Sequence, residues 1–142
     1  MKVRVTVEGF SVDEALSYLP VGRAGAYVVF LGRVRDISRG KKVKKLVYEV
    51  YEEMATREME AIREEAIGRF GLIDMLIWHR FGELPVGEDT ILVIAVSPHR
   101  EAAFEACRWA VDEVKHRVPV WKKEIREDGS FWIEGDEAIP EE

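Results

Sequence analysis

The helix predicted to begin at Ser97-Pro98 and to end near Arg117 carries two basic side chains in its first turn, His99 and Arg100. Free backbone N–H groups and the helix dipole already make this end of a helix positive, so Asp or Glu would be favoured there. Two basic residues in this position therefore indicate a site for an anion such as phosphate. The alternative, equally open from the sequence, is that Arg100 extends into solvent or to a nearby carboxylate.

The last turn of the same helix is also basic, with Lys115, His116 and Arg117. Cations at a helix C-terminus offset the dipole, so their position does not by itself separate a catalytic role from a structural one. A structural role is the simpler interpretation of this cluster when it is considered alone.

Two further lysines, Lys122 and Lys123, lie in a strand predicted at residues 120–126. Successive side chains of a strand point to opposite faces, so at most one of them readily joins a given pocket. Lys122 shares its face with Glu124. Lys123 shares the other face with Trp121 and is predicted to extend over the core.

A basic segment overlaps the end of the second predicted strand and continues beyond it, with seven basic residues between positions 33 and 45 against Asp36 alone. This segment carries a charge of +6, so the rest of the chain carries −12. Arg33 and Arg35 share a face of the strand, where they could hold a phosphate or a carboxylate through bidentate hydrogen bonds. The alternatives are an edge strand protected against aggregation and, for the whole segment, a solvated hairpin loop.

The remaining histidines and the single cysteine favour structural roles. No metal site is expected, because His79, His99 and His116 lack the spacing of metal ligands. Cys107 lies on the apolar stripe of its helix with no histidine near it, which favours a core residue over a nucleophile. His79-Arg80 precedes a turn predicted at residues 82–87 and is interpreted as a structural loop anchor rather than as another polar site.

Strands and helices in a mixed order must position these residues. Period-two alternation with β-branched residues predicts strands at 2–7, 25–35, 43–51, 72–81, 90–96, 120–126 and 130–134, the last two joined at Asp128-Gly129. Helices are predicted from Ser11, where Glu14 completes a capping box, to Leu19, at about 52–70, and at 97–117. Hairpins mixed with three helices indicate an α+β domain with a mainly antiparallel sheet.

The composition is that of one domain, at residues 1–134, followed by an acidic, mobile tail at 135–142. A net charge of −6 argues against a general nucleic-acid binder. The sequence has neither the pattern of a signal peptide nor an apolar run of membrane-spanning length, and its one cysteine fits a reducing compartment. A cytoplasmic protein without a membrane partner is expected.

Five segments of the sequence form a recognisable set. They are Gly25-Ala26 with residues 30–35 (FLGRVR), residues 48–55 (YEVYEEMA), 79–88 (HRFGELPVGE), 97–104 (SPHREAAF) and 115–124 (KHRVPVWKKE), followed by Asp128-Gly129 and Trp132. In this order and at near-continuous spacing over about Gly25 to Trp132, they resemble the large, catalytic subunit of molybdopterin synthase.

The resemblance implies an α/β hammerhead-type fold and a homodimer within a heterotetramer. The implied partner is a small ubiquitin-like sulfur-carrier subunit whose C-terminal Gly-Gly thiocarboxylate enters the active site. The implied activity is that of a sulfurtransferase in molybdenum cofactor biosynthesis. Two thiocarboxylates supply the dithiolene sulfurs of molybdopterin, and the substrate is cyclic pyranopterin monophosphate (precursor Z), whose cyclic phosphate is opened. The resemblance implies no metal and no other cofactor.

Carried over residue by residue, the catalytic lysines of the family fall on Lys115 and Lys122. The residues that match its substrate-contacting segments are Arg33, Val34, Arg35, His99, Arg100, Lys115, Lys122, Lys123 and Glu124. Lys123 fits least well, because alternation along its strand turns its side chain away. Some family members place an arginine just beyond the match to residues 132–134, whereas this chain has Gly135-Asp136 and lacks that basic residue.

His99 and Lys115 are 16 residues apart on one predicted helix, a separation of about 24 Å at 1.5 Å per residue. One small pterin does not bridge that distance. If both ends of the helix serve one substrate, we expect His99 and Arg100 to enter the pocket that holds Lys115 and Lys122 of a second copy.

Two other functions fit parts of the sequence. A non-enzymatic binding module would use the segment 33–45 to grip a nucleotide, an RNA or an acidic protein surface, yet this segment lacks the interleaved aromatic residues of single-strand binders. A degenerate homologue would bind the carrier without catalysis, and the presence of both Lys115 and Lys122 argues against it.

Overall fold

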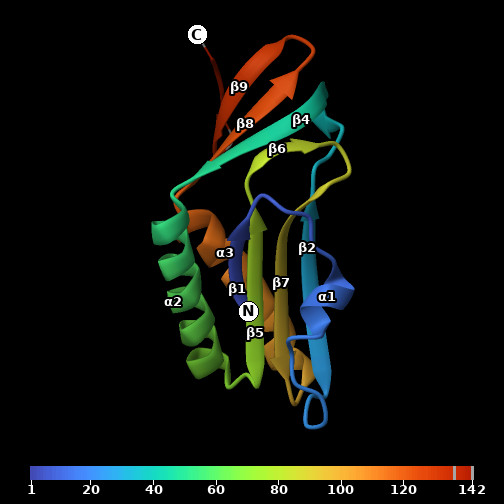
Figure 1. Cartoon of the computed structure of the whole chain (residues 1–142), viewed down its shortest axis with the longest axis vertical. Coiled ribbons are helices and arrows are strands. Elements are labelled where there is room, and N and C mark those ends of the chain that lie inside the picture. Colours follow the sequence, from blue (N-terminus) through green and yellow to red (C-terminus); the bar gives the residue numbers. More distant parts are fainter. Residues whose placement is uncertain (136, 142) are drawn as a thin grey trace.

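The computed structural model describes residues 1–135 and 137–141, which form two sheets and three helices. The elements in chain order are β1 (Val3–Thr6), α1 (Val12–Leu16), β2 (Ala26–Arg33), β3 (Ile37–Ser38), β4 (Lys41–Val50), α2 (Glu52–Phe70), β5 (Asp74–Arg80), β6 (Gly82–Pro85), β7 (Asp89–Ser97), α3 (Arg100–Arg117), β8 (Val120–Arg126), β9 (Gly129–Glu134) and β10 (Glu137–Pro140). Figure 1 shows one sheet standing upright and the other lying across its upper end.

The upright sheet has the strand order β1-β5-β7-β2, with β1 parallel to β5 and antiparallel pairing elsewhere. Along β5, Met75 and Ile77 pack in the core cluster that includes α2 and α3, whereas Leu76 and Trp78 pack in a second cluster with Ala15 of α1. Side chains that alternate between two covered faces explain why the whole of β5 is buried.

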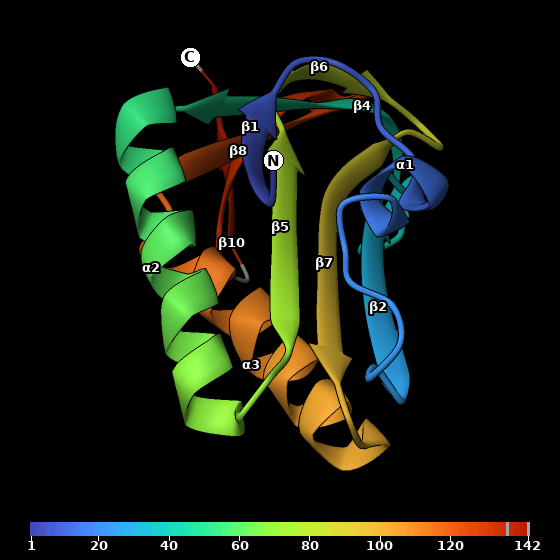
Figure 2. The same cartoon turned by 60° about the horizontal axis from the view of Figure 1, so that its bottom comes forward.

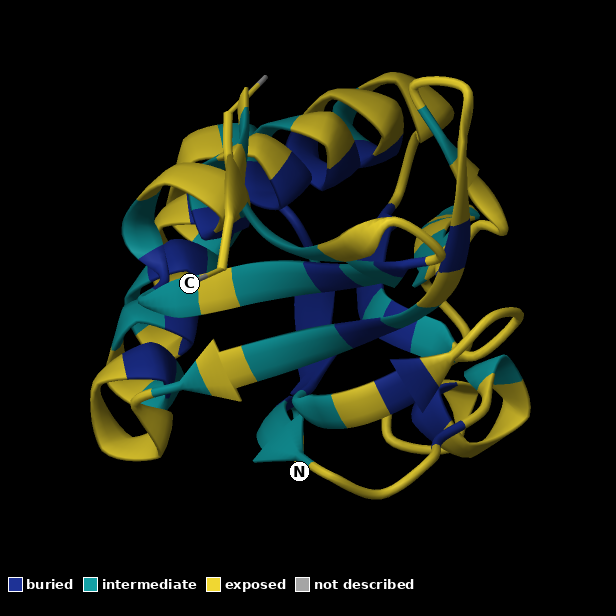
Figure 3. Ribbon diagram, turned by 90° about the horizontal axis from the view of Figure 1, so that it is seen from above, coloured by how far each residue is buried: buried dark blue, intermediate teal, exposed yellow. Residues whose placement is uncertain are grey.

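The two long helices, α2 and α3, lie on the same side of the upright sheet, as Figure 2 shows. Their inner faces are buried and their outer faces exposed (Figure 3). Arg117, at the end of α3, joins the two helices through Nε, 2.9 Å from Glu58 Oε1, and Nη2, 2.6 Å from Glu65 Oε2. This member of the basic C-terminal turn is therefore engaged in a structural contact. Within the described residues, no helix is long and apolar enough to cross a membrane.

The second sheet has the order β10-β9-β8-β4-β3, and β6 also pairs with β4. The antiparallel pairing of β4 with β8 runs from Val43 opposite Arg126 to Val50 opposite Val120. β8 and β9 form the predicted hairpin, in which Gly129 takes a φ of +132°. The mainly antiparallel α+β architecture is confirmed, and β8 lies in the interior of its sheet.

The start of α3 differs from the prediction. Ser97 is the last residue of β7, where it pairs with Ala26, and α3 begins at Arg100 with His99 at the N-cap. The Ser97 hydroxyl accepts a hydrogen bond from the His99 N–H at 3.3 Å. The predicted cap at Ser97 was wrong because pairing with β2 extends the strand to this residue.

The other differences concern short elements. Ser11 Oγ accepts from the Glu14 N–H at 3.1 Å, which confirms the predicted capping contact, but α1 ends at Leu16 rather than Leu19. The turn predicted at 82–87 contains the strand β6, which forms because β4 extends far enough to pair with it.

Residues 137–140, predicted to belong to an acidic mobile tail, instead form β10. Ile139 pairs with Trp132 of β9, and Glu141 accepts a hydrogen bond from Lys123 Nζ at 2.9 Å. Without β10, β9 would present unpaired N–H and C=O groups at the edge of the sheet, and this pairing outweighs the acidic composition. Asp136 and Glu142 lie outside the described residues. Asp136 belongs to the segment where some family members have a basic residue and this chain has none.

The prediction that His79-Arg80 is a structural anchor is confirmed. Arg80 donates to the carbonyls of Val7 and Asp89, both at 3.3 Å, and thereby ties the loop after β1 and the start of β7 to the end of β5. The imidazole Nδ1 of His79 donates to the Arg80 carbonyl at 2.7 Å. Burial lowers the pKa of His79 and so keeps the ring neutral, whereas this hydrogen bond has the opposite, smaller effect on the pKa.

Substitution of Gly25 tests the packing that holds the start of α3. A Cβ at this position would lie 2.0 Å from the Pro98 carbonyl oxygen, which is backbone and has little freedom to move. We expect Gly25→Ala to lower the free energy of unfolding by about 2–3 kcal/mol in chemical denaturation. The matched control is Gly68→Ala in α2, where nothing lies within 4 Å and where alanine should raise stability by about 0.5–1 kcal/mol. Equal effects of the two substitutions would contradict this packing.

Candidate active site

Lys122 occupies the middle of the second sheet, because its strand β8 pairs with β4 on one side and with β9 on the other. Tyr48 of β4 and Ile133 of β9 are its partners in register. Its side chain is half-buried. Glu124, two residues further along β8, lies on the same face and is buried.

Burial is the main reason that the pKa of Lys122 lies below its ordinary value. Glu124 opposes the shift, whereas the cations of Lys115, Arg35 and Arg39 increase it. The fold therefore brings Lys115 from the end of α3, Arg35 from beyond β2 and Arg39 from the β3–β4 turn within electrostatic range of one amine. Cationic crowding of this kind favours a lysine that can release its proton closer to neutral pH.

A polar network supports the lysine face of β8. Arg126 Nε donates to Glu124 Oε1 at 2.8 Å, and both side chains are buried. The ring of Tyr48 lies edge-on to that of His79 at 5.4 Å. Burial raises the pKa of Tyr48, the hydrogen bond of its hydroxyl with Thr90 opposes this, and the charge of Glu124 adds to it. The sequence prediction did not include Tyr48 among the site residues. Tyr48 is the cross-strand partner of Lys122, and this becomes visible only once β4 and β8 are paired.

The three residues predicted at the end of β2 have different environments. Arg33 Nε donates to Asp89 Oδ1 at 2.8 Å, so this guanidinium is held at the β2–β7 ladder. Val34 is buried and hydrogen-bonded through its backbone to the 87–88 turn. Arg35 is exposed and is the one of the three that acts on Lys122. A register shift between Gly32 and Arg33 ends the regular alternation that the prediction assumed.

Lys123 lies apart from Lys122 and the cations around it. Its Nζ donates to Glu141 Oε2 at 2.9 Å and lies 5.1 Å from the centre of the Trp132 ring. These contacts place its side chain on the side of the sheet that carries Trp132, opposite to the face of Lys122.

His99 and Arg100 lie at the opposite end of α3 from Lys115. They line a shallow cavity of about 420 Å³ with Gly25, Pro98 and Glu101. Because α3 is continuous from Arg100 to Arg117, its length keeps the two ends about 24 Å apart. A single chain does not bring the two predicted halves of the site together.

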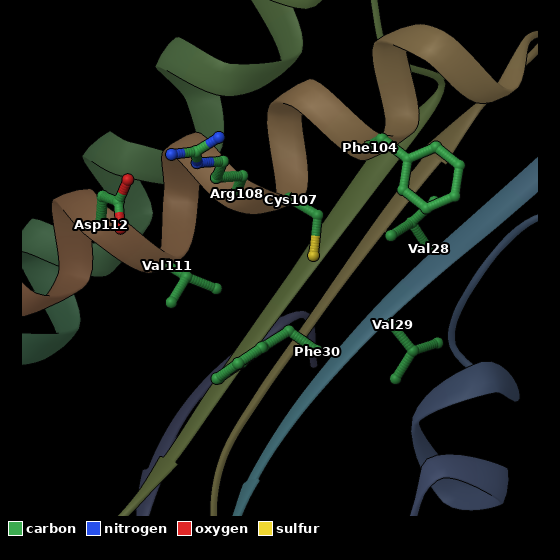
Figure 4. Close-up of a pocket in the computed structure, with 8 residues that line it drawn as sticks. All are labelled: Val28, Val29, Phe30, Phe104, Cys107, Arg108, Val111 and Asp112. Atoms are coloured by element: carbon green, nitrogen blue, oxygen red, sulfur yellow. The ribbon is translucent and has the colours of Figure 1, made fainter.

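An apolar groove of about 300 Å³ lies between these two ends, where α3 packs on the edge strand β2. Figure 4 shows the side chains that line it, which are Val28, Val29, Phe30, Phe104, Cys107, Arg108, Val111 and Asp112. Phe104 is 62% exposed. Burial raises the pKa of the Cys107 thiol to about 11, so this thiol is a poor nucleophile and the prediction of a core residue is confirmed.

The described part of the chain has no group of three or more His, Cys, Asp or Glu side chains that could hold a metal ion. The chemistry available at the cluster is instead that of amines and guanidinium groups next to one buried carboxylate. Such a set can bind anions, stabilise an oxyanion and transfer protons.

Comparison with known proteins identifies relatives of this chain. Residues 5–117 match the family described as MoaE protein. The molybdopterin synthase catalytic subunit of Pyrococcus abyssi is 57% identical over 133 residues, which cover 94% of this chain and 90% of the relative. The crystal structure of molybdopterin synthase from Staphylococcus aureus aligns with a TM-score of 0.87 at 35% identity, over 92% of this chain and 95% of that one. A complex of subunits 1 and 2 of the molybdopterin-converting factor from Helicobacter pylori shares the fold, with a TM-score of 0.73 at 19% identity, over 95% of this chain and 92% of that one.

The cationic crowding of Lys122 can be tested by titration. We expect Lys115→Ala and Arg35→Ala each to raise the pKa of Lys122, because each removes a like charge. NMR titration of the lysine Nζ and Cε signals measures it, with Lys42→Ala in the exposed part of β4 as the control of equal charge change.

The same shift has a consequence for stability. Since the folded state binds fewer protons at Lys122 than the unfolded state, the free energy of unfolding should rise with pH between the folded pKa and 10.5, and Lys122→Met should remove this rise. A Lys122 pKa that is unchanged by both Lys115→Ala and Arg35→Ala would contradict the proximity of these cations to Lys122.

Proposed function

The chain belongs to the MoaE family of molybdopterin synthase catalytic subunits, enzymes of molybdenum cofactor biosynthesis, and on this premise we propose that it transfers sulfur to cyclic pyranopterin monophosphate. The sulfur donor is a small ubiquitin-like carrier subunit that ends in a Gly-Gly thiocarboxylate. Two carriers are consumed for each dithiolene, and each one leaves as a carboxylate. The cyclic phosphate opens in the same overall reaction.

The observation that supports this function most directly is the half-buried amine of Lys122, beside Lys115 and Arg35. The thiocarboxylate sulfur bonds to a pterin carbon and forms a thioester. Water then attacks the thioester carbonyl, and collapse of the resulting oxyanion breaks the carbonyl C–S bond, which leaves the sulfur on the pterin and releases the carrier as a carboxylate. The substrate also brings a phosphate, so negative charge accumulates during the reaction. Fixed cations in a partly dehydrated site stabilise such charge without the reorganisation that water would need. A lysine with a lowered pKa can also transfer a proton or attack a carbonyl carbon.

The roles proposed for individual residues follow from where the fold places them. Lys115 and Lys122 are the catalytic pair, and Arg35 contacts the substrate beside them. Glu124 orients Lys122 and keeps the local charge from becoming wholly positive. Lys123 has its own partner on the other side of the sheet, in Glu141, and is assigned here to the stability of β10 rather than to the substrate.

The second half of the proposed site comes from another copy of the chain. His99 and Arg100 are too far from Lys115 to contact the same pterin within one chain, and the apolar groove on α3 lies midway between them. A two-fold axis near Cys107 would run two α3 helices antiparallel, cover Phe104, and place His99 of one chain beside Lys115 of its partner. The proposed assembly is such a homodimer with a carrier at each site, in the cytoplasm. The two-subunit complex of the Helicobacter pylori neighbour is the precedent within this fold for a partner subunit.

The two adjacent lysines of β8 give a sharp test of the catalytic assignment. The assay measures molybdopterin formed from the thiocarboxylated carrier and cyclic pyranopterin monophosphate. We expect Lys122→Ala to lower the rate by about 100-fold or more, because it removes a charge-stabilising group from the reacting centre. Lys123→Ala should retain the rate within about threefold, which is less than the tenfold change in rate produced by about 1.4 kcal/mol of barrier height. Equal losses in the two variants, with unchanged thermal stability, would show that the assignment to one face is wrong.

Mixing inactive chains tests the shared site. Heterodimers of His99→Ala and Lys122→Ala contain one pocket that carries both substitutions and one pocket that is intact. We expect recovery of roughly a quarter of the wild-type rate in a fully exchanged equimolar mixture, since half of the dimers are mixed and each has one intact site of two. Chain exchange is verified by native mass spectrometry. A mixture no more active than its parents, after exchange, would place both residues in one chain's site or in separate sites.

A further inference from the structure

The turn between β3 and β4 holds an arginine in an unusual backbone conformation. Ser38 pairs with Lys41, so Arg39 and Gly40 form a two-residue hairpin loop. Both have positive φ, 51° for Arg39 and 77° for Gly40. Hairpin loops of this kind favour Asn, Asp or Gly at the first position, because a side chain with a longer stem is disfavoured in the left-handed region.

The side chain of Arg39 extends from this turn to the segment that follows β9. Its Nη2 lies 3.5 Å from the carbonyl oxygen of Gly135, which follows β9. Ile133, two residues before Gly135, is the cross-strand partner of Lys122. With about 3.3 Å between residues and about 4.8 Å between strands, the Gly135 carbonyl lies roughly 8 Å from the Lys122 backbone.

The guanidinium of Arg39 therefore lies at the end of β9 that pairs with the Lys122 region of β8, although 83 positions separate Arg39 from Lys122 in the sequence. The positive charge of Arg39 also lowers the pKa of Lys122, which agrees with this placement. Arg35 acts on Lys122 from the same stretch of chain. The two arginines thus approach the catalytic lysine from either end of the short β3 segment.

We infer that Arg39 is a further substrate-binding residue of this site, and that the left-handed hairpin turn positions its guanidinium for the phosphate of the substrate. The inference rests on the proposed function, because that function supplies the phosphate. A guanidinium presents five donors in a planar fork that fits two phosphate oxygens at once. A non-glycine residue held at positive φ stores strain, and strain of this kind concentrates at functional sites. Glycine would form this turn more easily but would remove the charge.

This conflict between turn stability and charge makes Arg39→Gly a decisive variant. If Arg39 serves the substrate, the variant should melt at a higher temperature than the wild type and yet have a KM for cyclic pyranopterin monophosphate about tenfold higher, with kcat within about twofold, because one charge-assisted contact is lost. Arg39→Lys keeps the charge without the fork and should give an intermediate KM. Lys42→Ala removes the same charge from the adjoining strand and should leave KM within about twofold, a difference well below the tenfold step of a lost contact.

Binding of inorganic pyrophosphate, measured by calorimetry, separates this inference from the proposed function. We expect Arg39→Gly to weaken pyrophosphate binding about tenfold and Lys42→Ala to leave it unchanged. An active wild type whose KM and pyrophosphate affinity are unaffected by Arg39→Gly would overturn the role of Arg39 and leave the function standing. Loss of pyrophosphate affinity in this variant, in a chain that forms no molybdopterin, would uphold the anion contact and overturn the function.

Discussion

The amine of Lys122 is half-buried among like charges, and this unfavourable electrostatic arrangement is the constraint on which the site depends. An exposed lysine would separate from Lys115 and Arg35 and would keep its ordinary pKa. The pairing of β8 with β4 and β9 prevents this, because a strand within a sheet cannot move away from its neighbours. The buried carboxylate of Glu124, held in place by Arg126, supplies negative charge on the same strand and offsets part of this crowding.

The second sheet can hold this arrangement because the first sheet carries most of the hydrophobic core. β5 and β7 are buried on both faces, and α2 and α3 cover one of these two faces. The upper sheet is left with a small apolar cluster and a surface that can be polar. The rigid helix α3 then sets the distance between the two groups of basic residues, which makes a second copy of the chain part of the proposed chemistry.

The long elements could be predicted from the sequence because their signals are local. Alternation marks β5 and β7, the Ser11–Glu14 spacing marks a helix start, and Asp128-Gly129 marks a hairpin. The errors occur where a partner strand decides the outcome. Ser97 has the chemistry of a helix cap but pairs with β2, and residues 137–140 have the composition of a tail but complete the edge of β9.

Residue types and spacing were enough to mark the side chains that could do chemistry, which are the basic residues at both ends of α3, on β8 and after β2. Alternation along β8 also separated Lys122 from Lys123. Which of these residues meet depends on the packing of the two sheets and α3. Arg33 is held by Asp89, Arg117 by the carboxylates of α2, and Arg35 and Arg39 approach Lys122. The reason is physical: the type of a side chain is local, whereas its distance from another charge depends on strand register and on the packing of elements far apart in the chain.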